Sequence, residues 1–436
     1  MFNFASTSSF NISPALLQAL TYWRSEGPEC VLQYLSSLDP LEIEQCPFLS
    51  EIKSRCVGQA GPRLLIDGIW FVRSFGGISR VWQQILRTWS LPGLNNESAQ
   101  ILLIDRDSHL PETDRFVQID ATHANPFDWS AFRSISDENG QICKQYSADV
   151  FLSSWISSSG SDRSSCSELA LVHDCIPERI SSLDEPLRLL RRRWLTGASS
   201  HLAVSQSTAQ DVALALGSKS LKVDWCHPST VHFFQDHEGL LTHNHLLSGL
   251  ALPSPYLLLP ASAAIGTYKN PELVLAALSD PRCSSVNLLL TGQSSLPYVS
   301  AFEDFHTSLR GRVFSRSFTD LELQLAYQHA LSVVVPSRFE GFGLPVIEAL
   351  ASGGYVISTD VPGLREASGG CVPCLDPDCP QALADWVALL LDPASAYWIR
   401  PHLQRRRLTR LSRLHPDLLG LGLLIKARQL FESASG

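Results

Sequence analysis

The chain has 436 residues, of which 44% are hydrophobic and 18% are charged, and its formal net charge at pH 7 is −9. This length is enough for two or three domains with large buried cores. The negative net charge argues against a general nucleic-acid-binding protein, whose surface is basic, and no apolar run is long enough to predict a transmembrane helix. Residues 1–10 lack the basic and apolar regions of a signal peptide, so we expect a cytoplasmic protein.

The 11 cysteines are expected to be free thiols, because their number is odd and the chain carries no secretion signal. One group, Cys371, Cys374 and Cys379, has spacing that suggests a metal site. It lacks a fourth ligand, so we predict neither a metal nor a redox function there.

Residues 1–60 are predicted to form a helical N-terminal extension, with amphipathic patterns at Ala15–Tyr22 and Cys30–Leu38. Residues 61–250 form a first α/β domain, with strands expected at 63–66, 101–104, 150–152, 169–172, 202–204 and 221–225. After the first of these strands, Gly76-Gly77 precedes a helix whose apolar residues, from Ile78 to Trp89, follow helical spacing. A helix N-terminus presents unpaired N–H groups, so this glycine loop is a candidate anion site.

His173 directly follows the strand at 169–172, at the end where open α/β sheets bind ligands. Ser207 and Gln210 predict a capping box for a helix that ends at Gly217. Residues 226–255 are expected to be a loop-rich connector. Its histidines lack the spacing of metal ligands and are predicted to be solvated: His227, His232, His237, His243 and His245.

Residues 251–415 form a second domain, with strands expected at 256–259, 286–291, 313–314, 331–335 and 355–358. Asn270-Pro271-Glu272 predicts a helix start, with Asn270 as the N-cap and Lys269 directly before it. Thr319 and Glu322 predict a capping box for a helix over 320–327. Further helices are expected at 382–391 and 418–431. The alternation of strands and helices predicts a parallel sheet in each domain.

The segment Glu340-Gly-Phe-Gly-Leu-Pro-Val-Ile-Glu348 follows the strand at 331–335. Gly341 and Gly343 allow a tight loop, and Pro345 suits the first residue of a helix. The N–H groups and the dipole of a helix N-terminus bind phosphate. The carboxylates of Glu340 and Glu348 instead accept hydrogen bonds from hydroxyls. A ligand with a central phosphate and hydroxyls on both sides is a nucleotide sugar.

This segment resembles the signature of family-four retaining glycosyltransferases of the GT-B fold, the glycosyl transferases group 1. The resemblance extends from about Arg63 to the C-terminus and is strongest over 314–370. The run from Gly76 to Arg80 is similar to the family's first glycine loop, and His173 with Asp174 to its acceptor-side segment. The resemblance implies two Rossmann-like domains that face each other across a cleft, and a C-terminal helix, residues 416–436, that crosses back to the first domain.

The resemblance also implies the reaction, which is transfer of a hexose, with mannose and glucose as candidates, from a nucleoside diphosphate sugar to a hydroxyl with retention at the anomeric carbon. It makes His173 and Glu340 the catalytic residues, with Glu340 on the sugar. It assigns donor binding to the remaining residues, in which Glu348 holds the ribose and the others lie at or near the diphosphate: Gly76, Gly77, Arg80, Lys269, Gly341, Phe342, Gly343, Leu344 and Glu348. No metal and no other cofactor is expected, and the acceptor is a glycan, a lipid-linked or a small molecule.

The segment before Lys269 departs from the family pattern. Members usually carry an Arg four or five residues before this lysine, whereas Pro260 to Lys269 contains none. Of the two candidate replacements, Arg80 is preferred and Arg338 is expected to make a structural contact. Because a cation is missing, a catalytically weakened sugar-nucleotide-binding or scaffold protein stays an alternative, as does a GT-B epimerase. The sequence leaves the nucleobase, the sugar and the acceptor open.

Basic residues cluster in Leu187–Leu195 and again at Arg405-Arg406-Arg407 and Arg410. Basic helices of this kind lie on anionic lipid. They predict peripheral contact with the inner membrane surface, with a solvated helix face as the alternative.

Overall fold

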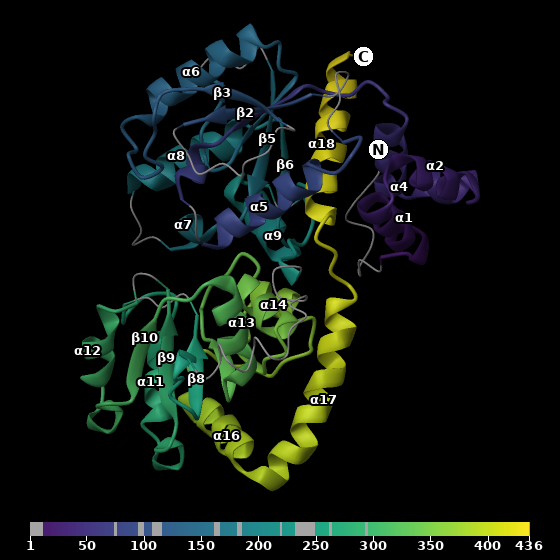
Figure 1. The fold of residues 1–436 in the computed structure, drawn as a ribbon. Coiled ribbons are helices and arrows are strands. Elements are labelled where there is room, and N and C mark those ends of the chain that lie inside the picture. The colour runs from purple at the N-terminus through teal and green to yellow at the C-terminus, as the bar shows by residue number, and fades with distance from the viewer. Residues whose placement is uncertain are drawn as a thin grey trace. The chain divides into compact units, whose positions relative to one another are not determined.

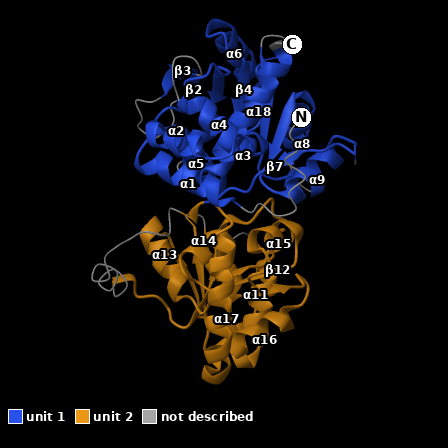
Figure 2. Ribbon diagram, turned by 90° about the vertical axis from the view of Figure 1, so that its right-hand side faces the viewer, with its two compact units in different colours: residues 1–229, 415–436 blue, residues 230–414 orange. Residues whose placement is uncertain are grey.

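The computed structural model describes residues 12–73, 76–94, 100–106, 116–160, 166–180, 185–218, 220–231, 249–260, 264–292 and 295–435. It divides into two compact units (Figure 2). Unit 1 comprises Met1–Ser229 and His415–Gly436, and unit 2 comprises Thr230–Leu414. The division at Ser229 differs from the expected one at residue 250, and four of the connector histidines lie outside the described residues: His232, His237, His243 and His245.

Unit 1 is built on a sheet of parallel strands in the order β3-β2-β1-β4-β5-β6-β7 (Figure 1). Leu64 of β1 lies opposite Ile101 of β2 on one side and Val150 of β4 on the other. The strands are short and mostly buried, as a sheet with helices on both faces requires. Their bounds are β1 Leu64–Asp67, β2 Ile101–Asp105, β3 Val117–Asp120, β4 Val150–Ser153, β5 Ser167–Val172, β6 Ser200–Ala203 and β7 Asp224–Trp225.

Helices cover both faces of this sheet. Helix α5 buries the apolar stripe predicted from its sequence, including Trp82 and Trp89. The predicted capping box of α9 is wrong: the N-cap is Ser205, whose Oγ accepts from the N–H of Thr208 at 3.0 Å, so the helix begins before Ser207. The helices are α5 Gly77–Trp89, α6 Phe132–Gln145, α7 Ile176–Arg179, α8 Glu185–Gly197 and α9 Gln206–Ala215, with the 3-10 turn η2 at Ile69–Val72.

The N-terminal extension is helical, and its first two helices match the predicted patterns. Each helix begins with a proline, whose missing N–H costs nothing in the first turn: α1 Pro14–Ser25, α2 Pro28–Ser36, α3 Pro40–Gln45 and α4 Pro47–Cys56. Helix α4 packs against α18 (Leu418–Ser435), which also packs on α5, β5 and β6 (Figure 1). Partly buried ion pairs hold the extension to the C-terminal segment, with Arg428 Nε 2.6 Å from Glu51 Oε2 of α4 and Arg24 of α1 2.5 Å from Asp417.

Unit 2 repeats the same plan, with parallel strands in the order β10-β9-β8-β11-β12-β13. Its strands are β8 Tyr256–Leu259, β9 Asn287–Thr291, β10 Val313–Arg316, β11 Ser332–Val335, β12 Val356–Thr359 and β13 Cys374–Leu375. Its helices are α11 Pro271–Leu278, α12 Tyr298–Glu303, α13 Asp320–His329, α14 Leu344–Ala351, α15 Pro362–Ser368, α16 Pro380–Leu391 and α17 Pro393–Leu411, with 3-10 turns η5 Pro281–Cys283 and η6 Thr307–Leu309. No helix of the described residues is long and apolar enough to cross a bilayer.

The predicted helix starts of unit 2 have mixed outcomes. The capping box of Thr319 and Glu322 is confirmed. The side-chain cap by Asn270 is wrong: Asn270 is in the left-handed region (φ 53°), and its amide instead donates to the carbonyls of Pro336 at 3.1 Å and Pro377 at 2.9 Å. Asn270, on the segment after β8, is therefore bonded to the segments that follow β11 and β13.

Candidate functional site

The loops after β8 and β11 meet at one edge of the unit 2 sheet. These strands are neighbours, and the strand order reverses between them, because β8 pairs with β9 on its other side. Open α/β sheets bind ligands outside the carboxyl ends of the strands at such a reversal. Lys269 lies on the segment after β8 and Glu340 on the loop after β11. Lys269 Nζ is 2.7 Å from Glu340 Oε1, and the side chains are 25% and 14% exposed.

Short contacts position this ion pair. The Ser337 hydroxyl donates to the same Glu340 oxygen at 2.7 Å. The N–H of Arg338 donates to the carbonyl of Tyr268 at 2.7 Å, which ties the two loops together through their backbones. Lys269 Nζ also lies 5.2 Å from the centre of the Tyr268 ring, within the range of a cation–π contact. The pair is thus held by neighbours on both loops.

Arg338 makes the structural contact expected of it. One guanidinium nitrogen lies 2.7 Å from Asp378 Oδ1, and the same group donates to Asn270 Oδ1 at 3.4 Å. Arg338 is therefore bonded to Asp378 and Asn270, whereas Lys269 and Glu340 pair with each other.

The glycine loop after β11 leads directly into α14. Gly343 is the N-cap with φ 121°, and a Cβ there would come 2.6 Å from Leu364 of α15. A Cβ on Gly363 would overlap the carbonyl oxygen of Glu340. Close packing of α15 against the loop thus requires glycine at both places. Pro345 is the second residue of the helix, not the first as predicted, because α14 begins at Leu344.

Glu348 lies one turn into α14 and is 5% exposed. Its Oε2 accepts from the hydroxyl of Tyr327, on α13, at 3.2 Å, and Tyr327 is itself 1% exposed. The carboxylate is thus oriented by a buried neighbour, which leaves Glu348 less accessible than Glu340.

In unit 1 the first glycine loop also ends at a helix N-terminus. Gly76 is the N-cap of α5 with φ 111°, and the N–H of Arg80 donates to its carbonyl at 3.1 Å. Ser74 and Phe75 lie outside the described residues. The structure therefore confirms the helix start that the sequence predicted, with Gly77 as its first residue.

His173 follows β5, at the carboxyl edge of the unit 1 sheet. Burial lowers its pKa to about 4, and the charge of Asp174 opposes this shift. Among the described residues its Nε2 has no hydrogen-bond partner. The adjacent turn is held by Arg191 of α8, which donates to the carbonyl of Asp174 at 2.6 Å and to Glu178 at 2.7 Å. His173 is therefore neutral at pH 7.

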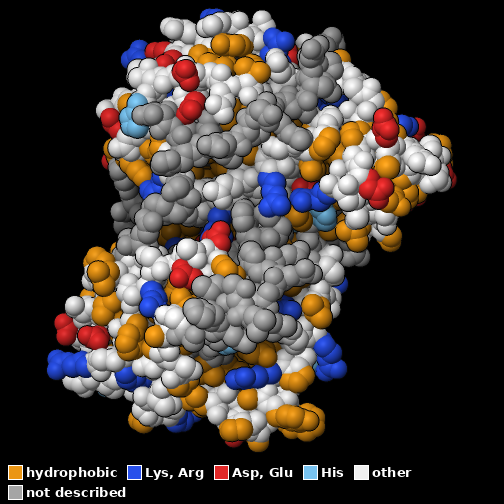
Figure 3. Space-filling view, viewed as in Figure 1, with side chains coloured by type: hydrophobic (Ala, Val, Ile, Leu, Met, Phe, Trp, Pro, Cys, Tyr) orange, Lys and Arg blue, Asp and Glu red, His pale blue; other side chains and the backbone are white. Residues whose placement is uncertain are grey.

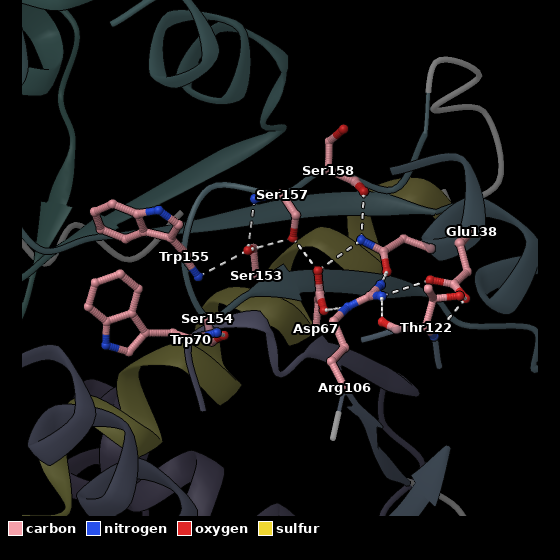
Figure 4. Close-up of polar contacts among 11 residues, drawn as sticks. Asp67, Trp70, Arg106, Thr122, Glu138, Ser153, Ser154, Trp155, Ser157 and Ser158 are labelled. Carbon is pink, nitrogen blue, oxygen red and sulfur yellow. Dashed lines mark hydrogen bonds and ion pairs between the residues drawn. The ribbon is translucent and has the colours of Figure 1, made fainter. Parts of the chain in front are cut away.

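A buried polar network lies at the reversal of strand order in unit 1 (Figure 4). Arg106, which is 0% exposed, donates to Asp67 at 2.6 Å, to Glu138 at 2.7 Å and to Asn139 at 2.7 Å. Asn139 donates to Asp67 at 3.0 Å, and the Ser157 hydroxyl donates to the same carboxylate. The network joins β1, α6 and the segments that follow β2 and β4.

This network was not predicted from the sequence, because its members lie far apart in the chain and on different elements. The one local signal was Asp67, a charged residue that ends an apolar strand directly before Gly68. A Cβ on Gly68 would meet the carbonyl oxygen of Ile104, so the chain turns there at close range.

The loops above the network are also tied to each other. The N–H of Trp70 donates to Ser154 Oγ at 2.9 Å, and the N–H of Trp155 donates to Ser153 Oγ at 3.0 Å. The two indole rings lie 4.5 Å apart (Figure 4). The segments that follow β1 and β4 therefore contact each other at this edge of the sheet.

None of the described residues forms a group of His, Cys, Asp and Glu side chains that could hold a metal ion. Within the cysteine group of unit 2, Cys371 Sγ contacts the carbonyl of Arg406 at 2.8 Å and Cys374 Sγ lies 3.5 Å from Ser358 Oγ. These thiols take part in packing.

Part of unit 2 matches a known family model. Residues 255–392 match the model of the family described as glycosyl transferases group 1. The serotype-specific mannosyltransferase WbdA of Escherichia coli is 26% identical over 246 residues, which are 50% of this chain and 29% of that protein. The O-antigen chain mannosyltransferase RfbU of Salmonella typhimurium is 42% identical over 57 residues, 13% of this chain and 16% of that protein. The matched regions thus span less than a third of either relative.

Solved structures share the fold over most of the chain. A sucrose-phosphate synthase from Thermosynechococcus elongatus has a TM-score of 0.65 at 17% identity and covers 85% of this chain and 100% of its own. WaaG, a glycosyltransferase involved in lipopolysaccharide biosynthesis, has a TM-score of 0.62 at 14% identity, with 82% and 98% covered. HepE of Anabaena, solved with UDP-glucose, has a TM-score of 0.60 at 15% identity, with 86% and 99% covered. The predicted GT-B fold and the predicted resemblance to group 1 are confirmed.

Proposed function

Because residues 255–392 match the model of the glycosyl transferases group 1, we propose that this protein transfers a hexose from a nucleoside diphosphate sugar to a hydroxyl acceptor with retention at the anomeric carbon. The observation that carries the proposal is the ion pair of Lys269 and Glu340 at the strand reversal of unit 2. It brings together a cation suited to a diphosphate and a carboxylate suited to sugar hydroxyls, beside the N-terminus of α14.

In this reaction the bond between the anomeric carbon and the diphosphate oxygen breaks, and a bond forms to the acceptor oxygen. The acceptor proton leaves with the diphosphate or to solvent. Negative charge develops on the leaving diphosphate, so groups that stabilise it lower the barrier. Lys269 and the first N–H groups of α14 supply such stabilisation. No carboxylate is assigned as a nucleophile.

Glu340 has two roles in this proposal. In the structure it neutralises Lys269, and with donor bound it accepts hydrogen bonds from the sugar. The ammonium group of Lys269 then pairs with the diphosphate instead of with Glu340. Glu348, oriented by the Tyr327 hydroxyl, accepts from the ribose.

We assign the acceptor to unit 1, where the side chain of His173 lies at the carboxyl edge of the sheet. A neutral imidazole both donates and accepts hydrogen bonds. His173, whose pKa of about 4 keeps it neutral, is suited to orienting a hydroxyl. The relatives that transfer mannose and the fold neighbour solved with UDP-glucose support a hexose donor.

A thermal-shift panel with GDP, UDP and ADP, followed by turnover assays with the matching mannose and glucose donors, tests the proposal. Binding to the folded state raises the melting temperature by mass action. We expect one nucleotide to stabilise the protein and its sugar to be transferred or slowly hydrolysed. No stabilisation by any nucleotide would overturn the proposal.

One observation favours a second candidate, a sugar-nucleotide-binding protein that has lost turnover. The segment from Pro260 to Lys269 contains no arginine, so the family's second cation is absent there. Nucleotide binding without transfer or hydrolysis, with glycan and lipid-linked acceptors supplied, would support this candidate over the enzyme.

A further inference from the structure

Positive charge is concentrated on one helix of unit 2. The segment from Pro393 to Leu414, which includes α17, contains six arginines and no acidic residue, although the whole chain has a net charge of −9. Helix α17 has 19 residues and the interior proline Pro401. Such a local excess of cations within an acidic protein indicates an anionic partner.

Large aromatic side chains of α17 are exposed to solvent. Tyr397 is 70% exposed and Trp398 is 76% exposed, and their rings form a T-shaped pair with centres 5.2 Å apart. Leu408 is 56% exposed. Trp398, Arg405 and Leu408 lie on one face of the helix, because their spacing matches its periodicity. Figure 3 shows hydrophobic side chains on the surface where α16 meets α17.

The opposite face of α17 attaches the helix to unit 2. Ala396 and Leu411 are buried, and Arg410 donates to the carbonyls of Ala367 at 2.7 Å and Glu366 at 2.8 Å. The guanidinium of Arg400 lies 5.3 Å from the centre of the Tyr355 ring. These contacts fix which face looks outward.

The charges on the outward face are not neutralised by neighbouring acids. Arg405 forms no ion pair with a described residue. On the adjoining α16, Asp385 pairs with Arg282 at 2.9 Å. Asp392 caps α17 by accepting from the N–H of Ser395 at 2.9 Å. The face thus combines exposed rings with an uncompensated positive charge.

Helix α8, the other basic segment, differs from α17. Its Trp194 and Leu195 are 5% and 1% exposed and belong to the core of unit 1. Arg191, 2% exposed, pairs with Glu178. The apolar side of the segment 187–195 is therefore occupied, and only Leu189, at 53% exposure, points an aliphatic side chain outward.

We propose that the outward face of α17 docks on an anionic lipid bilayer. Tryptophan and tyrosine favour the headgroup region, where the ring is apolar and its polar atom is wet. Arginines within a Debye length of the surface are attracted to lipid phosphates. Tyr397, Trp398 and Leu408 enter the headgroup region, and Arg405 and Arg413 contact the phosphates. The helix lies on the surface and does not cross it. This inference does not depend on the reaction proposed above.

Sedimentation of the full chain with lipid vesicles tests the proposal. We expect binding to vesicles of phosphatidylcholine mixed with phosphatidylglycerol, weaker binding at high salt, and little binding to phosphatidylcholine alone. The double variant Tyr397→Ser/Trp398→Ser should lower the partition coefficient at least ~10-fold. Arg405→Gln should lower it roughly 5-fold. Both sites are exposed, so the melting temperatures should stay near that of the parent.

The matched control is Arg192→Gln/Arg193→Gln on α8, which removes exposed arginines from the competing segment. It should bind vesicles like the parent. Three results would each overturn the proposal: no sedimentation of the parent with anionic vesicles, equal sedimentation of the parent and the Tyr397→Ser/Trp398→Ser variant, or loss of binding in the α8 variant alone. Because no step uses turnover, a failure here is distinguishable from a failure of the proposed reaction.

Discussion

The two sheets have the same strand order around their reversal points but place different chemistry there. In unit 1, at β1 and β4, Asp67, Arg106 and Asn139 are each 0% exposed and bond to one another. In unit 2, at β8 and β11, Lys269 and Glu340 form one ion pair whose side chains are 25% and 14% exposed. In unit 1 the charged side chains are buried and bonded to one another, whereas in unit 2 they are partly exposed and within reach of a ligand.

This difference indicates a structural role for the buried network of unit 1 and a ligand-binding role for the ion pair of unit 2. A buried charge that is fully hydrogen-bonded has no spare capacity for a ligand, and removing its partner leaves an isolated charge in a low dielectric. A partly exposed pair can exchange its internal bond for bonds to a ligand at small cost. We therefore expect mutations in unit 1's network to affect folding and mutations in unit 2's pair to affect activity.

The largest expected effect is on stability. Arg106→Leu removes the cation that pairs with the carboxylates of Asp67 and Glu138. The free energy of unfolding should therefore fall by about 3–5 kcal/mol. Urea denaturation followed by circular dichroism measures the change. The matched control in unit 2 is Arg338→Leu, which breaks a pair with Asp378 whose side chains are 38% and 72% exposed. That exposed pair is worth about 0–1 kcal/mol. Equal losses in the two variants would contradict the comparison.

The next effect is on turnover. Glu340→Gln removes the charge that faces Lys269 and the proposed sugar hydroxyls. Because the residue lies on a loop, the change creates no cavity in the core. We expect the rate of hexose transfer to fall at least ~100-fold with an unchanged melting temperature. Ser337→Ala removes one of the two hydrogen bonds that Glu340 Oε1 accepts, the other being from Lys269, and should cause a smaller loss. A folded Glu340→Gln variant with parental turnover would remove Glu340 from the site.

A smaller effect is expected on donor affinity. A charge-assisted hydrogen bond contributes roughly 1.5–3 kcal/mol, so Lys269→Ala should weaken donor binding by at least ~10-fold. Calorimetric titration of Lys269→Ala, Arg80→Ala and Arg338→Ala with the nucleotide found in the panel compares the cations. Arg338→Ala should bind like the parent. If Arg80→Ala also binds the nucleotide like the parent, Arg80 is not the replacement for the missing arginine. If Lys269→Ala binds it like the parent, the proposed phosphate site is wrong.

The sequence predicted the alternating fold well, because each element carries its own local pattern. The apolar stripe of α5, the capping box at Thr319 and strand β8 all depend on residues close together in the chain. The basic run at 405–410 was expected to be helical, but the 19-residue length of α17 was not predicted, since Pro401 in its interior and its exposed aromatic residues disrupt the amphipathic pattern. Asn270 was assigned as a cap on residue type alone, but carbonyls brought near by folding compete for its amide.

The candidate site could be predicted in unit 2 and only partly in unit 1. Glu340 and Glu348 fall within one short segment, so their spacing is visible without a structure. The pairing of Lys269 with Glu340, 71 residues away, required the two strands to be neighbours. The bonds among Asp67, Arg106 and Asn139 depend on separate elements meeting, which no local pattern encodes.

The last expected effect concerns pH and His173. Its pKa in the folded protein is about 4, below the ordinary value of 6.5, because burial disfavours the charged imidazolium. Between these values the unfolded chain binds a proton that the folded chain does not. The free energy of unfolding should therefore be unaffected by this group above pH 6.5 and should fall as the pH drops toward 4. His173→Gln cannot titrate, so its stability should fall less steeply over this range, by at most about 1.4 kcal/mol per pH unit. Urea denaturation of both proteins between pH 6.5 and pH 4 measures how steeply the free energy of unfolding depends on pH. Equal slopes for the two proteins would show that folding does not lower the pKa of His173.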